Sequence, residues 1–385
     1  MPRKLPPRPA GLSIETEIAQ GLFFYDEKTH NIHPPIYTGT TYLRDDNYEK
    51  KHGRGYIRDD NASLDQCSAL INHLENGAEA LLYPSGSSAM AAAFLALSSG
   101  EKCLVQDSLY YGLPQLVENH IKRYGIDVIW FSSGDDKALA TAIAQHKPNL
   151  VWVEVPSNPM NHIIDIALAA KHCHAIGAKL WVDNTAATPV LTRPLDFGAD
   201  YVVHSATKFL GGHNDLLAGV IITRQIDAIW QKIKEQRFLF GWMLDPFTAF
   251  LLTRSLKTLF LRVKKHCDNA AQIASFLHQH KNIALVRHAS QPCHPNYQVA
   301  QKQMIGGFGG LMGFHVKGGA AAALKAVQNL KTIRRATSLG GSESLAEHRH
   351  TVEGENSTTP PDLIRLSVGL EDPNDLIKDW EQALS

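Results

Sequence analysis

The sequence predicts an α/β fold with a mostly parallel β-sheet, covered by helices on both faces, and a smaller α+β domain towards the C-terminal end. Two observations support this fold class. Between residues 79 and 224, short apolar runs alternate with segments whose apolar residues recur at helical spacing. The apolar runs are continuous, as is typical of parallel strands buried on both faces. From about residue 245 the alternation gives way to a long helical segment.

The elements of the sheet domain can be assigned in chain order. Helices are expected where apolar residues keep helical spacing, several of them ending at a glycine: 63–77, 87–100, 113–123, 138–146 and 167–177. Strands are expected where short apolar runs end in turn residues: 79–86, 102–107, 124–131, 149–159, 179–189, 199–208 and 217–224.

Three parts of the chain are predicted. Residues 1–50 are polar and proline-bearing and are expected to form an extended arm that lies on a neighbouring subunit. Residues 51–245 form the sheet domain. Residues 246–385 form the smaller domain, which begins with one continuous helix over 246–280, because no proline follows Pro246 there. Strands or helices are expected at 309–316, 319–330 and 363–371.

Composition excludes several classes of protein. The 385 residues carry 38 Lys+Arg and 38 Asp+Glu, so the formal net charge is zero, and no basic stripe favours a nucleic-acid partner. No apolar stretch is long enough to span a bilayer, and no secretory signal follows the basic start of the chain. The five cysteines are scattered without a C-x-x-C pair, which indicates reduced thiols in a cytoplasmic protein: Cys67, Cys103, Cys173, Cys267 and Cys293.

Polar residues follow the predicted strands, at the edge where ligands bind to parallel sheets. "SGSS" (85–88) opens a helix after one strand, and a helix start with hydroxyl groups suits a phosphate. Asn158, Asp183 and the pair Thr207 and Lys208 follow three other strands. A buried lysine and a buried carboxylate are both costly unless they have partners, so a chemical role is indicated.

These residue types fit one ligand, pyridoxal phosphate. The cofactor has an aldehyde for a lysine, a pyridine nitrogen whose proton an aspartate stabilises, and a phosphate. Lysine is an established Schiff-base former. Taken singly, each signal has a structural reading: a Ser-Gly turn often only caps a helix, and Asn between prolines is often a turn residue. Their combination and order favour the cofactor.

The motifs resemble those of a known family. "HSATKFLGGHNDLLAG", "WVDNTAATP", "EVPSNP", "YIRDDNAS" and "RLSVGLE" are similar to the signatures of the Cys/Met-metabolism pyridoxal-phosphate enzymes, from about residue 30 to the end. That family includes cystathionine γ-synthase, cystathionine β-lyase, cystathionine γ-lyase and methionine γ-lyase. The resemblance implies the aspartate-aminotransferase type of fold and a homotetramer built from two dimers that share their active sites.

The resemblance also implies roles for individual residues. Lys208 would bind the cofactor covalently, Asp183 would pair with its pyridinium nitrogen, and Asn158 would lie near its phenolic oxygen. Tyr110 in "DSLYYGLPQ" matches the tyrosine that stacks on the cofactor and moves protons, and it is favoured over Tyr111 because it follows Asp107 by three residues. The phosphate ligands would be Gly86, Ser87, Ser205 and Thr207, together with Tyr56 and Arg58 from the neighbouring subunit.

The C-terminal motifs imply the substrate-binding residues. Arg365 matches the arginine that binds the substrate α-carboxylate, Ser338 lies near that carboxylate, and Glu343 matches an acidic position associated with cystathionine. The sequence departs from the family pattern over 346–361, "AEHRHTVEGENSTTPP", where the family usually has a proline, a Thr-His pair and a longer loop. Since that loop borders the substrate site, the departure leaves the substrate open.

The expected function is therefore that of a pyridoxal-phosphate-dependent carbon–sulfur lyase acting on a small sulfur amino acid. β-Cleavage of cystathionine is slightly favoured over γ-cleavage, and "GHNDLLAG" with Asn214 keeps γ-synthase chemistry open. A transaminase on the same fold is disfavoured by the Tyr56 and Arg58 motif. A metal-binding protein is disfavoured because the run "HCH" at 172–174 places neighbours on diverging faces of a helix.

Overall fold

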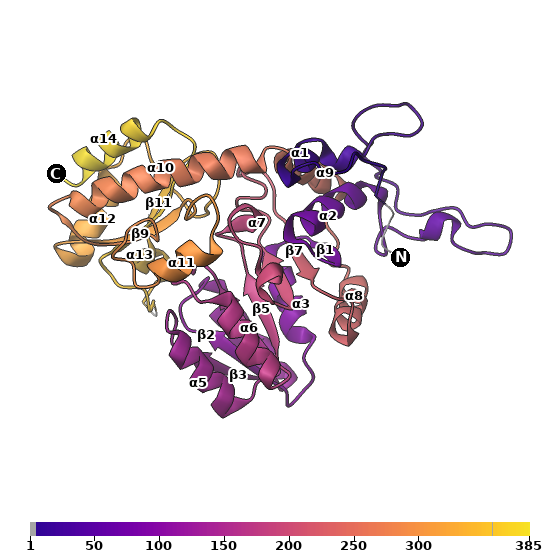
Figure 1. Ribbon diagram of the computed structural model, residues 1–385, viewed down its shortest axis with the longest axis horizontal. Coiled ribbons are helices and arrows are strands. Elements are labelled where there is room, and N and C mark those ends of the chain that lie inside the picture. Colours follow the sequence, from indigo (N-terminus) through magenta and orange to yellow (C-terminus); the bar gives the residue numbers. More distant parts are fainter. Residues whose placement is uncertain (1–4, 356) are drawn as a thin grey trace.

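Two β-sheets organise the molecule (Figure 1), whose computed structural model describes residues 5–355 and 357–385. The larger sheet has seven strands in the order β1-β7-β6-β5-β4-β2-β3. Every neighbouring pair in it is parallel except the two that β7 makes, with β1 and with β6. Its strands are β1 (Glu79–Tyr83), β2 (Lys102–Gln106), β3 (Asp127–Phe131), β4 (Leu150–Glu154), β5 (Lys179–Asp183), β6 (Tyr201–His204) and β7 (Gly219–Thr223).

Helices cover both faces of this sheet. One apolar core joins the sheet to α2 (Ala62–Glu75), α5 (Asp136–His146), α6 (Ile166–Ala175) and α9 (Pro246–Leu256). A second core joins the opposite face to α3 (Gly86–Leu95), α4 (Gly112–Asn119) and α8 (Ala228–Phe240). Short helical segments complete this part: η3 (Ile121–Tyr124), α7 (Thr188–Leu191) and η4 (Pro194–Phe197). The predicted α/β class with a mostly parallel sheet is confirmed.

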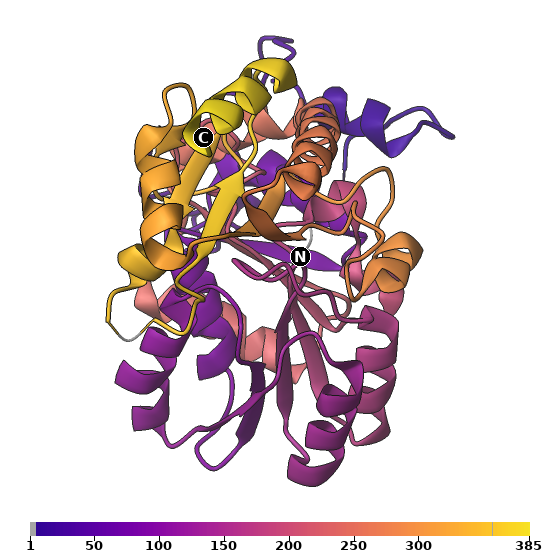
Figure 2. The same ribbon diagram turned by 90° about the vertical axis from the view of Figure 1, so that its left-hand side faces the viewer.

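The smaller sheet lies in the C-terminal part, above the larger one in Figure 2. Its order is β10-β11-β12-β9-β8, with strands β8 (Ile283–Arg287), β9 (Leu311–Val316), β10 (Arg334–Arg335), β11 (Leu345–His348) and β12 (Leu363–Ser367). It packs against α10 (Leu259–Gln279), α12 (Gly319–Asn329) and α14 (Pro373–Ala383). The remaining helices there are α11 (Tyr297–Gln303) and α13 (Arg349–Glu353).

The long helix predicted over 246–280 is two helices, and this part of the prediction is wrong. The chain leaves the helical conformation at Thr258, where φ is −111° and ψ is 12°. Arg262 stabilises the break, since its guanidinium donates to the carbonyl of Ser255 at 2.9 Å. The same guanidinium donates to the carbonyl of Phe209 at 2.7 Å. The break is therefore stabilised by a buried arginine with carbonyl partners. No proline or glycine marks it in the sequence, which is why the sequence pattern did not indicate it.

The N-terminal segment is extended and projects from the body of the molecule (Figure 1). It contains α1 (Ile14–Ala19), η1 (Gly21–Phe23) and η2 (Lys51–Gly53), and residues 1–4 of the predicted arm lie outside the described residues. Ile32 is 86% exposed, and Leu43 and Tyr48 are each 83% exposed. Among the described helices, none is long and apolar enough to cross a membrane.

Candidate active site

A cavity of about 130 Å³ lies at the carboxyl ends of the parallel strands. It is lined by side chains from the segments that follow β1, β2, β4, β5 and β6, so residues far apart in the sequence meet there. The lining includes these residues singled out in the sequence: Gly86, Ser87, Tyr110, Asn158, Asp183, Ser205, Thr207 and Lys208.

Lys208 is the only amine among the residues that line this cavity. Burial, and to a smaller extent the nearby Arg365 guanidinium, lower the pKa of Lys208 from 10.5 to about 8, while the Glu347 carboxylate acts in the opposite direction. The Nζ atom donates a hydrogen bond to Ser338 Oγ at 3.0 Å. The lowered pKa increases the fraction of neutral amine near neutral pH, which is the form that a nucleophile or base requires.

The start of α3 forms one wall of the cavity. Ser85 caps this helix, since its hydroxyl accepts from Ser88 N–H at 3.0 Å. A Cβ on Gly86 would lie 2.7 Å from the Cβ of Ser205, so only glycine lets the two segments approach this closely. The wall thus combines a helix start with the hydroxyl-bearing residues Ser87 and Ser205, which are donors suited to a phosphate.

Asp183 lies at the end of β5 and is buried. Its Oδ1 atom accepts from the Thr185 hydroxyl at 2.5 Å and from the Thr185 N–H at 3.0 Å. Burial raises the pKa of Asp183 and these two hydrogen bonds partly offset that change. Among the described residues Asp183 forms no ion pair, so a cationic ligand group is the partner that this carboxylate lacks.

Glu154 was missed in the sequence. It is buried at the end of β4, and its carboxylate accepts from the backbone N–H of Asn158 at 2.6 Å and of Tyr110 at 2.9 Å. Burial and the neighbouring Asp183 carboxylate raise the pKa of Glu154. Glu154 therefore fixes the two loops that carry Asn158 and Tyr110. The signal for it is a glutamate inside the continuous apolar run "VWVEV".

The two adjacent tyrosines have different positions. Tyr110 lines the cavity, and burial raises the pKa of its hydroxyl. Tyr111 is absent from the cavity lining, and its ring lies 5.2 Å from that of Tyr110 and carries the guanidinium of Arg349 at 5.0 Å. The structure therefore brings Tyr110 to Lys208 and Asp183, in line with the preference stated from the sequence.

Arg365 lies on β12, beside the cavity, and is buried. Its NH2 group donates to the carbonyl of Ser338 at 2.7 Å, and its NH1 group approaches Asn158 Oδ1 at 3.5 Å. The same guanidinium pairs with the Glu347 carboxylate. Burial lowers the pKa of Arg365 to about 10, well above neutrality, so the group stays a cation.

A neighbouring cavity of about 330 Å³ shares Thr207 with the first one and includes Ser338. Glu343 lines it, and its carboxylate accepts from Asn214 Nδ2 at 2.9 Å. Arg334, which is exposed, lines it as well. This second cavity thus offers one fixed carboxylate and one guanidinium next to the lysine.

Tyr56 and Arg58 do not line the cavity of their own chain. Arg58 is exposed, and its guanidinium lies over the rings of Phe238, at 4.8 Å, and Tyr56, at 5.3 Å. Their expected contact with the cofactor of a neighbouring subunit stays a prediction.

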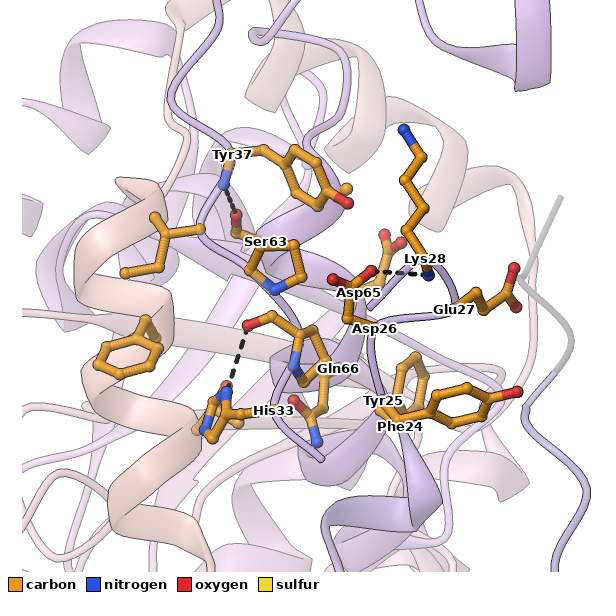
Figure 3. A pocket seen from close by; sticks show the side chains of 16 residues that line it. Phe24, Tyr25, Asp26, Glu27, Lys28, His33, Tyr37, Ser63, Asp65 and Gln66 are labelled. Atoms are coloured by element: carbon orange, nitrogen blue, oxygen red, sulfur yellow. Dashed lines mark hydrogen bonds between the residues drawn. The ribbon is translucent and has the colours of Figure 1, made fainter. Parts of the chain in front are cut away.

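A further cavity of about 250 Å³ lies between the arm and helices α2 and α9 (Figure 3). In it, the Tyr37 N–H donates to Ser63 Oγ at 2.8 Å, and the Lys28 N–H donates to Asp26 Oδ1 at 3.1 Å. None of its lining residues belongs to the site predicted from the sequence. Its larger volume therefore does not make it the better candidate for chemistry.

The residues at the strand ends fit pyridoxal phosphate. The amine of Lys208 suits the aldehyde, and the carboxylate of Asp183, buried without an ion-pair partner among the described residues, suits a pyridinium nitrogen. The close approach of Gly86 to Ser205 at the start of α3 suits the phosphate.

Comparisons with known proteins point to the same chemistry. A family model described as Cys/Met metabolism PLP-dependent enzyme matches residues 15–385. Cystathionine gamma-synthase of Mycobacterium tuberculosis is 35% identical over 370 residues, which cover 93% of each protein. Cystathionine beta-lyase of Coxiella burnetii is 34% identical over 380 residues, covering 96% of this chain and 97% of that protein. The structure of cystathionine gamma synthase from Xanthomonas oryzae pv. oryzae in complex with cystathionine matches with a TM-score of 0.92 at 32% identity, covering 97% of this chain and 98% of that one.

Proposed function

The chain belongs to the Cys/Met metabolism PLP-dependent enzymes, with pyridoxal phosphate as its cofactor, and from this premise we propose that it cleaves the carbon–sulfur bond of cystathionine. β-Elimination to homocysteine, pyruvate and ammonia is the reaction we favour. The observation that carries this proposal is the pair of adjoining cavities. The first holds Lys208, and the second presents Glu343 and Arg334, which complement the ammonium and carboxylate groups of a second amino-acid end. Cystathionine has two such ends.

The roles that we propose for the residues are supported by their positions. When bound, pyridoxal phosphate supplies an electron sink for charge that develops at the substrate Cα atom. Arg365 binds the α-carboxylate and fixes the amino acid relative to Lys208. The neutral amine of Lys208, favoured by its lowered pKa, then removes the Cα proton. Asp183 would pair with the pyridinium nitrogen, and Asn158 would lie near the phenolic oxygen.

Tyr110 completes the proton-handling groups. Burial raises the pKa of its hydroxyl, so it keeps its proton near neutrality and donates it to the departing thiolate sulfur. The phosphate would be held by Gly86, Ser87, Ser205 and Thr207. In β-cleavage, the bond that breaks is the one between Cβ and sulfur, and the thiol leaves from Cβ.

γ-Synthase chemistry is the second candidate. The hydrogen bond from Asn214 to Glu343 favours it, because it fixes a carboxylate where the amino group of an incoming cysteine would bind. In that reaction cysteine replaces the acyl group of an O-acylhomoserine. The catalytic groups are the same, since Lys208 and Tyr110 also move the protons that γ-chemistry needs. γ-Cleavage of cystathionine uses them as well.

We propose further that the active enzyme is a cytoplasmic homotetramer made of two dimers. The exposed apolar residues of the arm and the exposed Arg58 support an interface there. In such a dimer Tyr56 and Arg58 would reach the phosphate in the neighbouring subunit. The cysteines are free thiols, as a reducing compartment would keep them.

The test is product analysis with L-cystathionine and the purified enzyme. Pyruvate with homocysteine supports β-cleavage, whereas 2-oxobutyrate with cysteine means γ-cleavage. If neither forms, but cysteine and an O-acylhomoserine give cystathionine, the enzyme is a γ-synthase. Lys208→Ala serves as the inactive control. An enzyme that holds pyridoxal phosphate but converts none of these compounds contradicts the proposal.

A further inference from the structure

Glu347 lies between two arginines beside the active site. It is on β11, directly opposite Arg365 on the antiparallel strand β12. A single oxygen, Oε2, accepts from Arg365 NH2 and also from Arg349 NH1, the latter at 2.9 Å. All three side chains are almost completely buried, with 4%, 1% and 3% exposure for Glu347, Arg349 and Arg365.

Arg349 belongs to the segment in which the sequence departs from the family pattern. Its NH2 group donates to Glu353 Oε1 at 2.8 Å, and its guanidinium lies over the ring of Tyr111. Glu353 in turn accepts from the hydroxyls of Ser357, at 2.6 Å, and Thr359, at 2.7 Å. In the described part of this segment, the guanidinium of Arg349 is therefore held on several sides, by Glu353 and by the ring of Tyr111.

The pairing leaves polar atoms unused. Glu347 Oε1 and Arg365 Nε are buried and have no hydrogen-bond partner among the described residues. Glu347 thus does not form a bidentate pair with Arg365, which is the geometry in which a carboxylate binds a guanidinium most tightly. Because Oε2 also accepts from Arg349, the charge of Glu347 is shared between two guanidinium groups.

We propose that Glu347 and Arg349 are positioning residues that set how tightly Arg365 binds a substrate carboxylate. Glu347 competes with the substrate for Arg365, and Arg349 limits this competition by sharing the same carboxylate oxygen. Arg349 also neutralises Glu347, whose charge would otherwise repel the incoming carboxylate. The inference rests on the role proposed for Arg365 in the function above, and it makes the altered segment a device for tuning carboxylate affinity.

The two residues have opposite effects in this scheme. Removing the charge of Glu347 frees Arg365, so carboxylate binding becomes tighter. When the charge of Arg349 is removed, Glu347 pairs with Arg365 alone and competes more strongly for it. Binding of the substrate carboxylate therefore becomes weaker. A purely structural role would weaken binding in both variants. The opposite signs therefore separate the proposal from a general disturbance of the fold.

The experiment measures ligand binding to the holoenzyme through the visible absorbance of its bound cofactor. Glycine is the probe, because it has an amine and a carboxylate but no group to eliminate. Ethylamine is the matched ligand without the carboxylate. We expect Glu347→Gln to tighten glycine binding about fivefold and Arg349→Met to weaken it about tenfold, with ethylamine changed by less than about twofold. Arg349→Lys, which keeps the charge, restores part of the loss.

Val352→Ala is the control variant, because Val352 is on the same short helix and is 46% exposed. The proposal is overturned if Glu347→Gln leaves glycine binding unchanged or weaker, or if ethylamine binding shifts as much as glycine binding. If Arg349→Met does not fold or does not hold the cofactor, the Glu347→Gln result decides alone. Because glycine binding needs no turnover, a failure to convert cystathionine would count against the proposed function and not against this inference.

Discussion

Lys208 and Ser338 are 130 residues apart, yet the lysine Nζ atom donates to the serine Oγ atom at 3.0 Å. This contact joins the end of β6 in the large sheet to the segment between β10 and β11 in the small one. Ser338 has a φ of +112°, a backbone conformation that residues other than glycine rarely adopt. Its carbonyl accepts from Arg365 at 2.7 Å, which holds the strained backbone in place. Strain of this kind is concentrated at binding sites.

Replacing Ser338 separates these two contributions. Ser338→Ala removes the partner of Lys208 but keeps the strain, and we expect kcat/KM to fall about tenfold, the effect of one hydrogen bond near the reacting atoms. Ser338→Gly removes the same hydroxyl and also relieves the strain. It should be more stable than Ser338→Ala by about 1 kcal/mol in denaturant unfolding. Equal stability of the two variants would mean that the backbone at residue 338 is not strained.

The lowered pKa of Lys208 has a consequence for stability. The pKa is 10.5 when exposed and about 8 in the folded chain, so between these pH values the unfolded chain binds more protons than the folded one. Stability supported by this group therefore rises as pH rises from about 8 towards 10.5. Below that window the buried lysine costs stability.

We accordingly expect Lys208→Met to stabilise the cofactor-free protein at pH 7, by up to about 3 kcal/mol for a shift of this size. The gain should shrink as the pH rises through the window. Urea unfolding of both proteins at several pH values after removal of the cofactor measures it. A gain that is independent of pH would assign the effect to packing and not to the charge.

Much of the fold and of the cavity could be predicted from the sequence, because the signals are local. Each parallel strand is a continuous apolar run, and the polar residue that ends it lies at the sheet edge by geometry alone. Asp183 after "KLWV" and Lys208 after "YVVHSA" are examples. What the sequence could not provide are contacts between distant segments.

Two particular features illustrate this limit. The break at Thr258 depends on Arg262 reaching carbonyls at Phe209 and Leu210, about fifty residues earlier in the chain. Similarly, Glu347 reads as part of an altered loop in the sequence, but its pairing with Arg365 across β11 and β12 makes it a strand residue. Sheet register is set by partners in other strands, so a single short segment does not reveal it.

Arg262 joins α10 to the segment that follows β6 through its carbonyl contacts, and this leads to a third prediction. Arg262→Met keeps most of the side-chain volume but leaves the carbonyls of Ser255 and Phe209 without their donor. We expect a loss of about 3 kcal/mol of unfolding free energy, since charged hydrogen bonds to buried carbonyls are lost. Because Phe209 follows Lys208 directly, cofactor affinity should fall as well. Denaturant unfolding and cofactor titration measure the two effects, and Lys264→Met, an exposed change on the same helix, is the control.

Glu343 distinguishes substrates by the number of their amino-acid ends. Its carboxylate is held by Asn214 and Ser342 and faces the cavity that adjoins Lys208. If it binds the distal ammonium group of cystathionine, Glu343→Gln should raise KM for cystathionine about fivefold, the effect of one partly exposed ion pair. Glycine, which has no distal end, should bind as before, and kcat should change little because the reacting atoms lie on the other side of Ser338. Steady-state kinetics with cystathionine, beside glycine titrations, separate the two quantities. If glycine binding weakens as much as cystathionine binding, then Glu343 acts on the α-carboxylate site through Ser338, and the second cavity does not hold the distal end of the substrate.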